Sequence, residues 1–193
     1  TPFQYNEPSI LLSNENDNQN SQQYNMRTVF NQSTLQSVFF IDKIYLSGQL
    51  NFDTINLDII CNEVIVGNKD WTNEYSDLIA MGSDGFEWTE DYCIPGEEIS
   101  IKNSESNETL HTLIGNKSWQ ANDFEIITLS DSEFGDVNFD KSVNITDIVV
   151  IIEHLLSINE ITNDHSLLLS DVNIDNDINV IDVIIIVDQI LED

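Results

Sequence analysis

Short apolar segments separated by turn residues occupy residues 29–130. The segments are rich in β-branched and aromatic side chains, and they lie at 38–41, 44–46, 55–60, 64–66, 99–101 and 124–129. Turn pairs such as Ser47-Gly48, Gly67-Asn68 and Pro95-Gly96 stand between them. Because short strands at this spacing are typical of two-layer antiparallel folds, the pattern predicts an antiparallel β-sandwich over residues 29–130.

The last third of the chain follows a different pattern. Two long apolar runs, Ile145 to Leu156 and Val180 to Leu191, have helical spacing, and an acidic loop precedes each of them. Apolar residues that recur at this period form one face of a helix. Residues 131–193 are therefore expected to form a separate helical domain, so that the fold is mainly β with a small α domain.

Residues 1–28 form an N-terminal extension. Its first part contains Phe3, Tyr5 and the run Ile10 to Leu12, and an Asn/Gln/Ser tract with the composition of a linker follows at 13–25. Two interpretations stand. In one, the first residues are donated as a strand to the sheet edge of a neighbouring molecule, and in the other the extension packs on its own domain.

The two acidic loops are copies of one twelve-residue pattern. The first, DVNFDKSVNITD, spans 136–147, and the second, DVNIDNDINVID, spans 171–182. Oxygen-bearing side chains recur at positions 1, 3, 5, 9 and 12, and position 7 offers its backbone carbonyl, as in loops that wrap a hard cation. We therefore predict two Ca²⁺ sites. The predicted ligands are Asp136, Asn138, Asp140, Ser142, Asn144 and Asp147 in the first site, and Asp171, Asn173, Asp175, Asp177, Asn179 and Asp182 in the second.

Each loop gathers at least three carboxylates, which repel one another without a cation, so folding and calcium binding are expected to be coupled. Hydrophobic residues stand at position 8 of both loops, Val143 and Ile178. We expect them to pair across the loops in a short β-bridge and to be buried between the helices. The alternative is two surface turns that carry Asp and Asn by chance, and the repetition of the pattern argues against it.

This repeat resembles the type I dockerin family over about residues 134–193. Members of that family carry two calcium loops of the form DxNxDxxxNxxD, each followed by one helix. The resemblance implies a dockerin-like pair of calcium loop–helix units, and it implies a cohesin-like protein as the partner.

The loops depart from the family pattern at two places. Position 6, where glycine is usual, is Lys141 in the first loop and Asn176 in the second. Because lysine tolerates a left-handed backbone less well than asparagine, we expect the first site to be the weaker one. Positions 10 and 11, where a polar pair is usual, include Ile145, Val180 and Ile181. This predicts an apolar packing surface that meets the chain's own sandwich or another subunit.

The β part carries a resemblance of its own. Residues 57–71 and 81–102, with the turn Gly82-Ser83-Asp84-Gly85 between two strands, are similar to an uncharacterised β-sandwich module of secreted proteins from marine bacteria. Such modules often precede dockerin-like repeats. The resemblance implies a secreted or cell-surface location and no particular chemistry.

Charge narrows the classes of partner. The chain has 35 Asp and Glu against six Lys and Arg, for a formal net charge of -29. A nucleic acid or an anionic membrane surface would need a basic face, so neither is expected as a partner. No apolar run approaches the roughly 20 residues that span a bilayer, so no membrane insertion is expected.

The ends and the cysteines also bear on location. The chain opens on Thr1 with no visible signal peptide, from which we expect a processed, extracellular form. Two alternatives stand for Cys61 and Cys93: they form one disulfide, or they are two buried free thiols. An oxidising compartment favours the disulfide.

Other candidate sites carry a structural alternative. Asp84, with Glu87, Glu90 and Asp91, forms a third cation site or a tight turn with solvated acids, and the turn is favoured. A set of aromatic residues could form a sugar-stacking platform or belong to the core, and the core is the favoured interpretation. This set consists of Trp71, Trp88, Trp119, Tyr75 and Tyr92. The three histidines, His111, His154 and His165, lie apart in sequence, and no catalytic motif is present, so no enzymatic activity is expected.

The leading hypothesis is an extracellular, calcium-stabilised structural protein. Copies would join head to tail into filaments, through residues 1–12 or through the dockerin-like domain, because a heterologous contact that does not close propagates as a fibre. The alternative is an adhesion or scaffold-docking module, in which the dockerin-like domain binds a cohesin-like partner and the sandwich binds a glycan.

Overall fold

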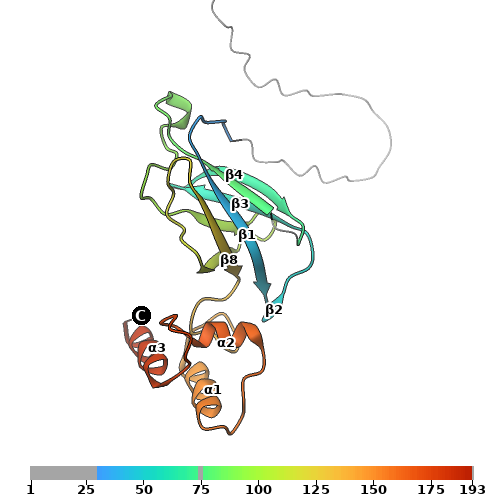
Figure 1. The fold of residues 1–193 in the computed structure, drawn as a ribbon, viewed down its shortest axis with the longest axis vertical. Coiled ribbons are helices and arrows are strands. Elements are labelled where there is room, and N and C mark those ends of the chain that lie inside the picture. The colour runs from blue at the N-terminus through green and yellow to red at the C-terminus, as the bar shows by residue number, and fades with distance from the viewer. Residues whose placement is uncertain (1–29, 74–75, 193) are drawn as a thin grey trace, which may run out of the picture.

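The computed structural model describes residues 30–73 and 76–192. Both interpretations of the N-terminal extension therefore concern residues outside the described part of the chain. Figure 1 shows a β part and a helical part that follow one another along the long axis of the molecule. The strands are β1 (Gln36–Leu46), β2 (Gln49–Leu50), β3 (Ile55–Cys61), β4 (Val64–Trp71), β5 (Ser76–Met81), β6 (Ser100–Asn103), β7 (Thr109–Ile114) and β8 (Phe124–Ser130). The helices are η1 (Glu87–Thr89), a single 3₁₀ turn, and α1 (Ile145–Leu155), α2 (Asp164–Ser170) and α3 (Val180–Glu192).

The mainly β character of residues 29–130 is confirmed, and two features differ from the prediction. All eight strands belong to one curled sheet in the order β2-β1-β8-β7-β6-β3-β4, with β5 paired to β1. The pairs are antiparallel except for β1 and β8, which run parallel. The strand segments do not indicate these features, because the parallel pairing of β1 and β8 joins residues 85 or 86 positions apart.

A glycine predicted to lie in a turn instead lies inside a strand. Gly67 is part of β4 and pairs with Ile59 beside a β-bulge. A Cβ atom at Gly67 would stand 2.1 Å from the carbonyl oxygen of Ile79, so β4 passes β5 too closely for any side chain. The glycine thus permits the curl that brings these two strands together.

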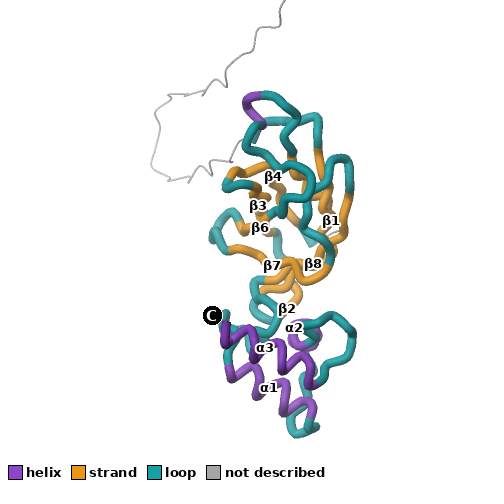
Figure 2. Tube along the Cα trace, turned by 90° about the vertical axis from the view of Figure 1, so that its left-hand side faces the viewer, coloured by secondary structure: helices purple, strands orange, loops and turns teal. Residues whose placement is uncertain are grey.

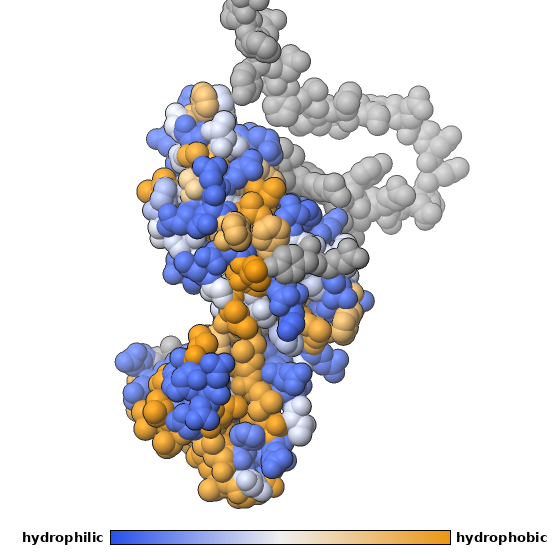
Figure 3. Space-filling view, in the orientation of Figure 1, coloured by the Kyte–Doolittle hydropathy of each residue, from blue (hydrophilic) through white to orange (hydrophobic). Residues whose placement is uncertain are grey.

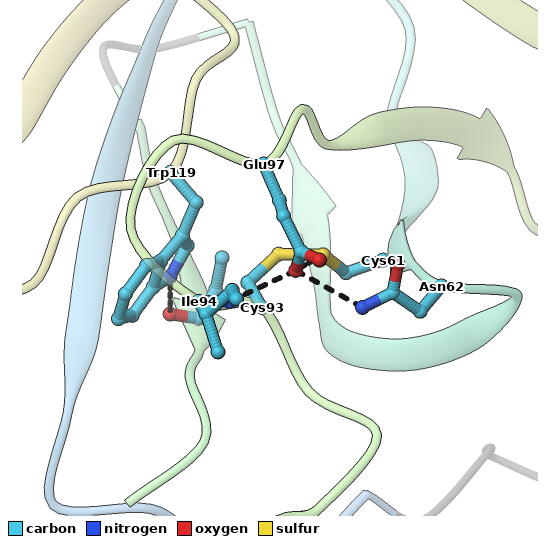
Figure 4. Close-up of a disulfide and its surroundings, with 7 residues drawn as sticks. Cys61, Asn62, Cys93, Ile94, Glu97 and Trp119 are labelled. Atoms are coloured by element: carbon cyan, nitrogen blue, oxygen red, sulfur yellow. Dashed lines mark hydrogen bonds between the residues drawn. A yellow bond between two sulfur atoms is a disulfide. The ribbon is translucent and has the colours of Figure 1, made fainter.

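The β core is built from inward-facing apolar residues of most strands, and the two largest are Trp71 and Trp119, which are 1% and 0% exposed. The indole N–H of Trp119 donates to the carbonyl oxygen of Ala80 at 3.0 Å. Cys61 and Cys93 form a disulfide beside this tryptophan (Figure 4), so the free-thiol alternative is wrong. The bond ties the end of β3 to the loop that follows η1.

The helical part has a small core of its own. α1 and α3 lie side by side (Figure 2) and confirm both predicted helices. Ile151 and Ile186 are fully buried between them, and Val143 and Ile178 pack against this cluster as predicted. The predicted β-bridge between these two residues does not form: the described residues have two isolated bridges, and both lie in the β part. α2 is a helix that the sequence pattern did not predict.

Candidate metal centre

The carboxylates that open and close the first loop collect backbone N–H groups. Asp136 accepts from the backbone of Asp140 at 3.1 Å through Oδ1 and from that of Lys141 at 3.2 Å through Oδ2. Asp147 Oδ1 accepts from the backbone of Val137 at 2.9 Å. One carboxylate oxygen from each of Asp136, Asp140 and Asp147 lies within 4.8 Å of the other two. The loop thus encloses a compact group of oxygen ligands.

The second loop repeats this bonding. Asp171 accepts from the backbone of Asp175 at 3.0 Å and from that of Asn176 at 2.8 Å, and Asp182 Oδ1 accepts from Val172 at 3.0 Å. Its carboxylates are less closely gathered, because no three of them meet the 4.8 Å spacing that the trio of the first loop meets. This geometry gives no support to a weaker first site, which stays a prediction.

The residues at positions 9 and 12 also start the helices. Asn144 caps α1 by accepting from the backbone of Thr146 at 2.8 Å, and Asp147 Oδ2 accepts from the backbone of Asn144 at 3.0 Å. Asn179 and Asp182 make the corresponding bonds at the start of α3. Because the amide oxygen at position 9 is occupied by the cap, its contact with a cation would run through a water molecule, as is common at this position.

Positions 4 and 6 of both loops have left-handed backbones. Phe139 and Lys141 have φ of 65° and 67°, and Ile174 and Asn176 have φ of 58° and 69°. This conformation costs roughly 1–2 kcal/mol for a residue with a side chain, and more for the β-branched Ile174. The hydrogen bonds to the carboxylates at positions 1 and 12 hold the loops in this shape.

The charges in the loops are buried without a cationic partner. Asp136, Asp147 and Asp182 are each at most 1% exposed, and no Lys, Arg or His among the described residues forms an ion pair with a loop carboxylate. Burial raises the pKa of Asp147, and the neighbouring Asp136 charge raises it further, although backbone hydrogen bonds oppose the shift. Buried carboxylates of this kind need a compensating charge, and clustered hard oxygens fit Ca²⁺.

Lys141, at position 6 of the first loop, turns away from the carboxylates and contacts the β part. Its Nζ atom lies 2.6 Å from Oδ2 of Asp131 and 3.0 Å from Oε1 of Glu108. Burial alone would lower the pKa of this ammonium, but the bonds to the two carboxylates outweigh burial and raise it. The ion pairs offset part of the cost of a left-handed lysine.

Phe139, at position 4, contributes a second contact between the two parts. Its ring stacks on the imidazole of His165 in α2, with centroids 5.0 Å apart, and it also covers Gly48. The imidazole stacks on Tyr45 at the end of β1 and shares a hydrogen bond of 2.9 Å with the Ser130 hydroxyl. The first loop and α2 therefore hold the helical part against one end of the sheet.

α2 and its contacts were not predicted from the sequence. Asn163 caps α2 by accepting from the backbone of His165 at 2.8 Å, and it donates to the carbonyl oxygen of Gly48 at 2.8 Å. The signal was an asparagine directly before an acidic residue and a run of leucines, which is a helix start. Seven residues are too few to display a period, so this signal stood alone.

The third candidate cation site, around Asp84, is a tight turn, which is the interpretation that the sequence favoured. Asp84 Oδ2 accepts from the backbone and the hydroxyl of Thr34, at 2.9 and 3.0 Å, and Oδ1 accepts from the Thr89 hydroxyl at 2.7 Å. The exposed acids Glu87 and Glu90 form no close cluster with Asp84 in the described part of the chain.

The aromatic set divides between the core and the surface. Trp71, Trp119 and Tyr92 are buried, as the favoured interpretation predicted, whereas Trp88 is 41% exposed. Tyr75 lies outside the described residues. The histidines stay apart: His165 is buried at the junction, His111 is exposed, and His154 accepts from the backbone of Ile161 within the helical part.

Comparison with known proteins adds one finding. Residues 134–191 match the family model of the dockerin type I domain. No curated protein and no solved structure matches the chain. The match agrees with the resemblance seen in the twin loops and supports calcium as the cation. It does not extend to the β part, so the resemblance of residues 57–71 and 81–102 to a secreted β-sandwich module stays a prediction.

Proposed function

We propose that the helical domain is a calcium-dependent docking module, which attaches the β domain to a partner protein of the cohesin type. The dockerin match at residues 134–191 suggests this class of partner. The observation that carries the proposal is an apolar surface on the helices, which is visible in orange on the lower part of Figure 3. Docking of the helical domain would thus attach the β domain to the partner protein.

The apolar surface comes from both loop–helix units. Its members are exposed by between 36% and 77%. They are Ile145, Val149, Ile152, Leu155 and Leu156 from α1 and its C-cap, and Val180, Ile181, Ile184, Val187 and Leu191 from α3. The residues at positions 10 and 11 were expected to pack against the chain's own sandwich or against another subunit. The chain's own sheet does not cover them, because Ile145, Val180 and Ile181 are more than half exposed. Contiguous apolar residues of this number mark an interaction site rather than ordinary surface.

Calcium is assigned a structural role in this proposal. Each loop would hold one ion through its carboxylates at positions 1, 5 and 12, the side chain at position 3 and the carbonyl at position 7. The ion would neutralise the buried charges and fix the start of the following helix. The spacing between the apolar residues of α1 and α3 would then depend on both loops.

The proposal places the chain outside the cell and gives it no catalytic role. The disulfide between Cys61 and Cys93 suits an oxidising compartment, as does the location implied by the dockerin match. Within the described residues, no helix is both long enough and apolar enough to cross a membrane.

A panel of purified cohesin domains tests the proposal. The full chain is expected to bind at least one of them in calcium and to lose binding in EGTA. Ile184→Ser, on the α3 surface, should weaken binding at least tenfold, whereas Ile114→Ser, equally exposed on β7, should leave it unchanged. No binding to any cohesin, or equal binding by both variants, would contradict the proposal.

Self-association is the second candidate, because a second copy could cover the same apolar helices. Filament formation through residues 1–12 stays a prediction, since those residues lie outside the described chain. Sedimentation velocity over a range of protein concentrations, with and without calcium, separates the candidates. A monomer that binds a cohesin supports docking, and calcium-dependent growth that Ile184→Ser abolishes supports self-association.

A further inference from the structure

The first acidic loop touches the β part through two side chains that are not cation ligands. Phe139 and Lys141 stand at positions 4 and 6, and in loops of this kind neither position supplies a ligand. The ring of Phe139 covers Gly48. The Lys141 ammonium lies 2.6 Å from a carboxylate oxygen of Asp131 and 3.0 Å from one of Glu108. The loop that would hold the ion is thus also part of the junction between the two domains.

The short helix α2 gives the same loop a second route to the sheet. The hydroxyl of Ser166 donates to the carbonyl oxygen of Val137, at position 2 of the loop, at 3.1 Å. The imidazole of His165 lies between the rings of Phe139 and Tyr45 and stacks on both. A movement of the loop would therefore displace α2 and the end of β1 as well.

The carboxylates of the first loop hold its junction residues in position. Asp136 accepts from the backbone of Asp140 and of Lys141, and the left-handed backbones at positions 4 and 6 depend on these bonds. Asp136, Asp140 and Asp147 place oxygens within 4.8 Å of one another, so without a cation they repel and favour a more open loop. Occupancy of the site and the position of the junction residues are therefore coupled.

The second loop has the same ligand pattern without the contacts to the sheet. Ile174 and Asn176 take positions 4 and 6, and both are exposed. The side-chain hydrogen bonds described for residues 171–182 all run between members of this loop. None of the ion pairs between described residues involves it. An ion in this loop would act within the helical domain alone.

We propose that the first calcium site has a second function, which is to lock the β domain onto the helical domain, and that the second site does not share it. This function rests on the calcium binding proposed for both loops. The ion would hold Asp136 and Asp140 together, which fixes Phe139 and Lys141 against the sheet. A partner docked on the helices would then carry the β domain in one orientation, and loss of this ion would free the β domain to reorient.

NMR relaxation of the ¹⁵N-labelled full chain tests the proposal, because it reports how fast each domain tumbles. With calcium bound, the residues of both domains are expected to share one rotational correlation time. Asp140→Ala removes the ligand at position 5 of the first loop and should give the two domains separate values. Asp175→Ala removes the matched ligand of the second loop and should leave one shared value. Both aspartates are exposed, so neither change opens a cavity.

A third variant separates calcium binding from the junction. Lys141→Asn changes no ligand and places at position 6 the residue type that the second loop has there. It removes the ion pairs to Asp131 and Glu108, which leaves the buried Asp131 carboxylate without its cation. The variant should still bind two calcium ions in titration calorimetry and keep its helices in circular dichroism. Its two domains should nevertheless tumble with separate correlation times.

The outcomes distinguish the lock from calcium binding itself. A shared correlation time in both Asp140→Ala and Lys141→Asn overturns the lock, and so does equal separation in Asp140→Ala and Asp175→Ala. Separate values in the original chain with calcium bound also overturn it. If Asp140→Ala loses its helices, Lys141→Asn decides, because it keeps every ligand. An original chain that binds no calcium refutes the calcium role as well, whereas calcium binding without these effects refutes the lock alone.

Discussion

The imidazole of His165 lies flat on the phenol ring of Tyr45, with centroids 4.4 Å apart and 12° between the ring planes. Tyr45 lies near the end of the first strand of the sheet, and His165 belongs to the short helix between the two acidic loops. Phe139 of the first loop stacks on the same imidazole, and Ile174 of the second loop, its counterpart, is 58% exposed. The two loops are alike in sequence, but the side chain at position 4 supports the junction in the first loop and is exposed in the second.

This asymmetry predicts unequal effects of matched substitutions in the two loops. Phe139→Ala should lower the free energy of unfolding by about 1–3 kcal/mol, because it removes the half-buried ring that contacts His165. Ile174→Ala should change it by at most about 0.5 kcal/mol, since that side chain is exposed. Urea denaturation measures both values. Equal losses in the two variants would show that the first loop has no special role at the junction.

Gly48 provides a second test of the junction. Its φ is 79°, and an added Cβ would stand 2.5 Å from the ring of Phe139. Gly85 also has a positive φ, 88°, but an added Cβ would meet nothing within 4 Å. Gly85→Ala should therefore cost about 1 kcal/mol for the backbone alone, and Gly48→Ala about 1–3 kcal/mol more for the clash. Differential scanning calorimetry compares the variants, and equal costs would contradict the packing described at Gly48.

Loss of a loop carboxylate should weaken calcium binding. Asp147→Ala and Asp182→Ala should each lower the calcium stoichiometry in titration calorimetry and reduce the rise in melting temperature that calcium produces. The rise reflects linkage, which is worth about 2.7 kcal/mol when calcium is at a hundred times its Kd. Asp188→Ala, an exposed acid on α3, is the control and should behave like the original chain. Unchanged melting in calcium for both loop variants would refute the assigned ligands.

Acid should weaken the junction through His165. Burial, together with Lys141, lowers the pKa of His165 to about 4 against the pull of Asp131 and Asp136, so the folded chain keeps this imidazole neutral. The unfolded chain binds a proton near pH 6.5, so stability is lost as pH falls from about 6.5 to 4, by up to about 3 kcal/mol. His165→Phe keeps a flat ring and cannot titrate.

The pH effect is measured as a difference between variants. The unfolding free energy of each protein is measured at pH 7 and at pH 4.5. Its decrease between the two pH values should be smaller for His165→Phe than for the original chain, because the contribution of the carboxylates is common to both proteins and cancels in the comparison. His111→Gln changes an exposed histidine and should keep the full pH dependence. An identical fall in all three proteins would exclude His165 as the titrating group.

The disulfide should stabilise the β domain. The bond between Cys61 and Cys93 closes a loop with a sequence separation of 32. Replacing both cysteines with serine should lower the free energy of unfolding by about 2–4 kcal/mol, through the greater freedom of the unfolded chain. A reductant should destabilise the original chain by a similar amount and leave the double variant unaffected. Equal stability of oxidised and reduced protein would contradict this prediction.

Sequence reasoning was most successful where the determinants are local. The residues from Asp136 to Asp147 and from Asp171 to Asp182 are contiguous, so their spacing records both the loop and the start of the next helix. α1 and α3 were predicted for the same reason, because an apolar stripe is a property of consecutive turns. The disulfide stayed open in the sequence, since two cysteines alone do not reveal the distance between them.

By itself, the sequence determined the twin calcium-type loops, the two helices that follow them and the β character of the longer part. Tertiary structure alone decided that β1 and β8 run parallel, that Gly67 lies within a strand, and that Phe139 and His165 meet Tyr45. The physical reason for the parallel pair and for the junction is the separation of the partners along the chain, which is 85 or 86 positions for β1 and β8 and 120 positions for Tyr45 and His165. A contact between residues more than a hundred positions apart leaves no period in the sequence, and folding must close the loop between them before the contact exists.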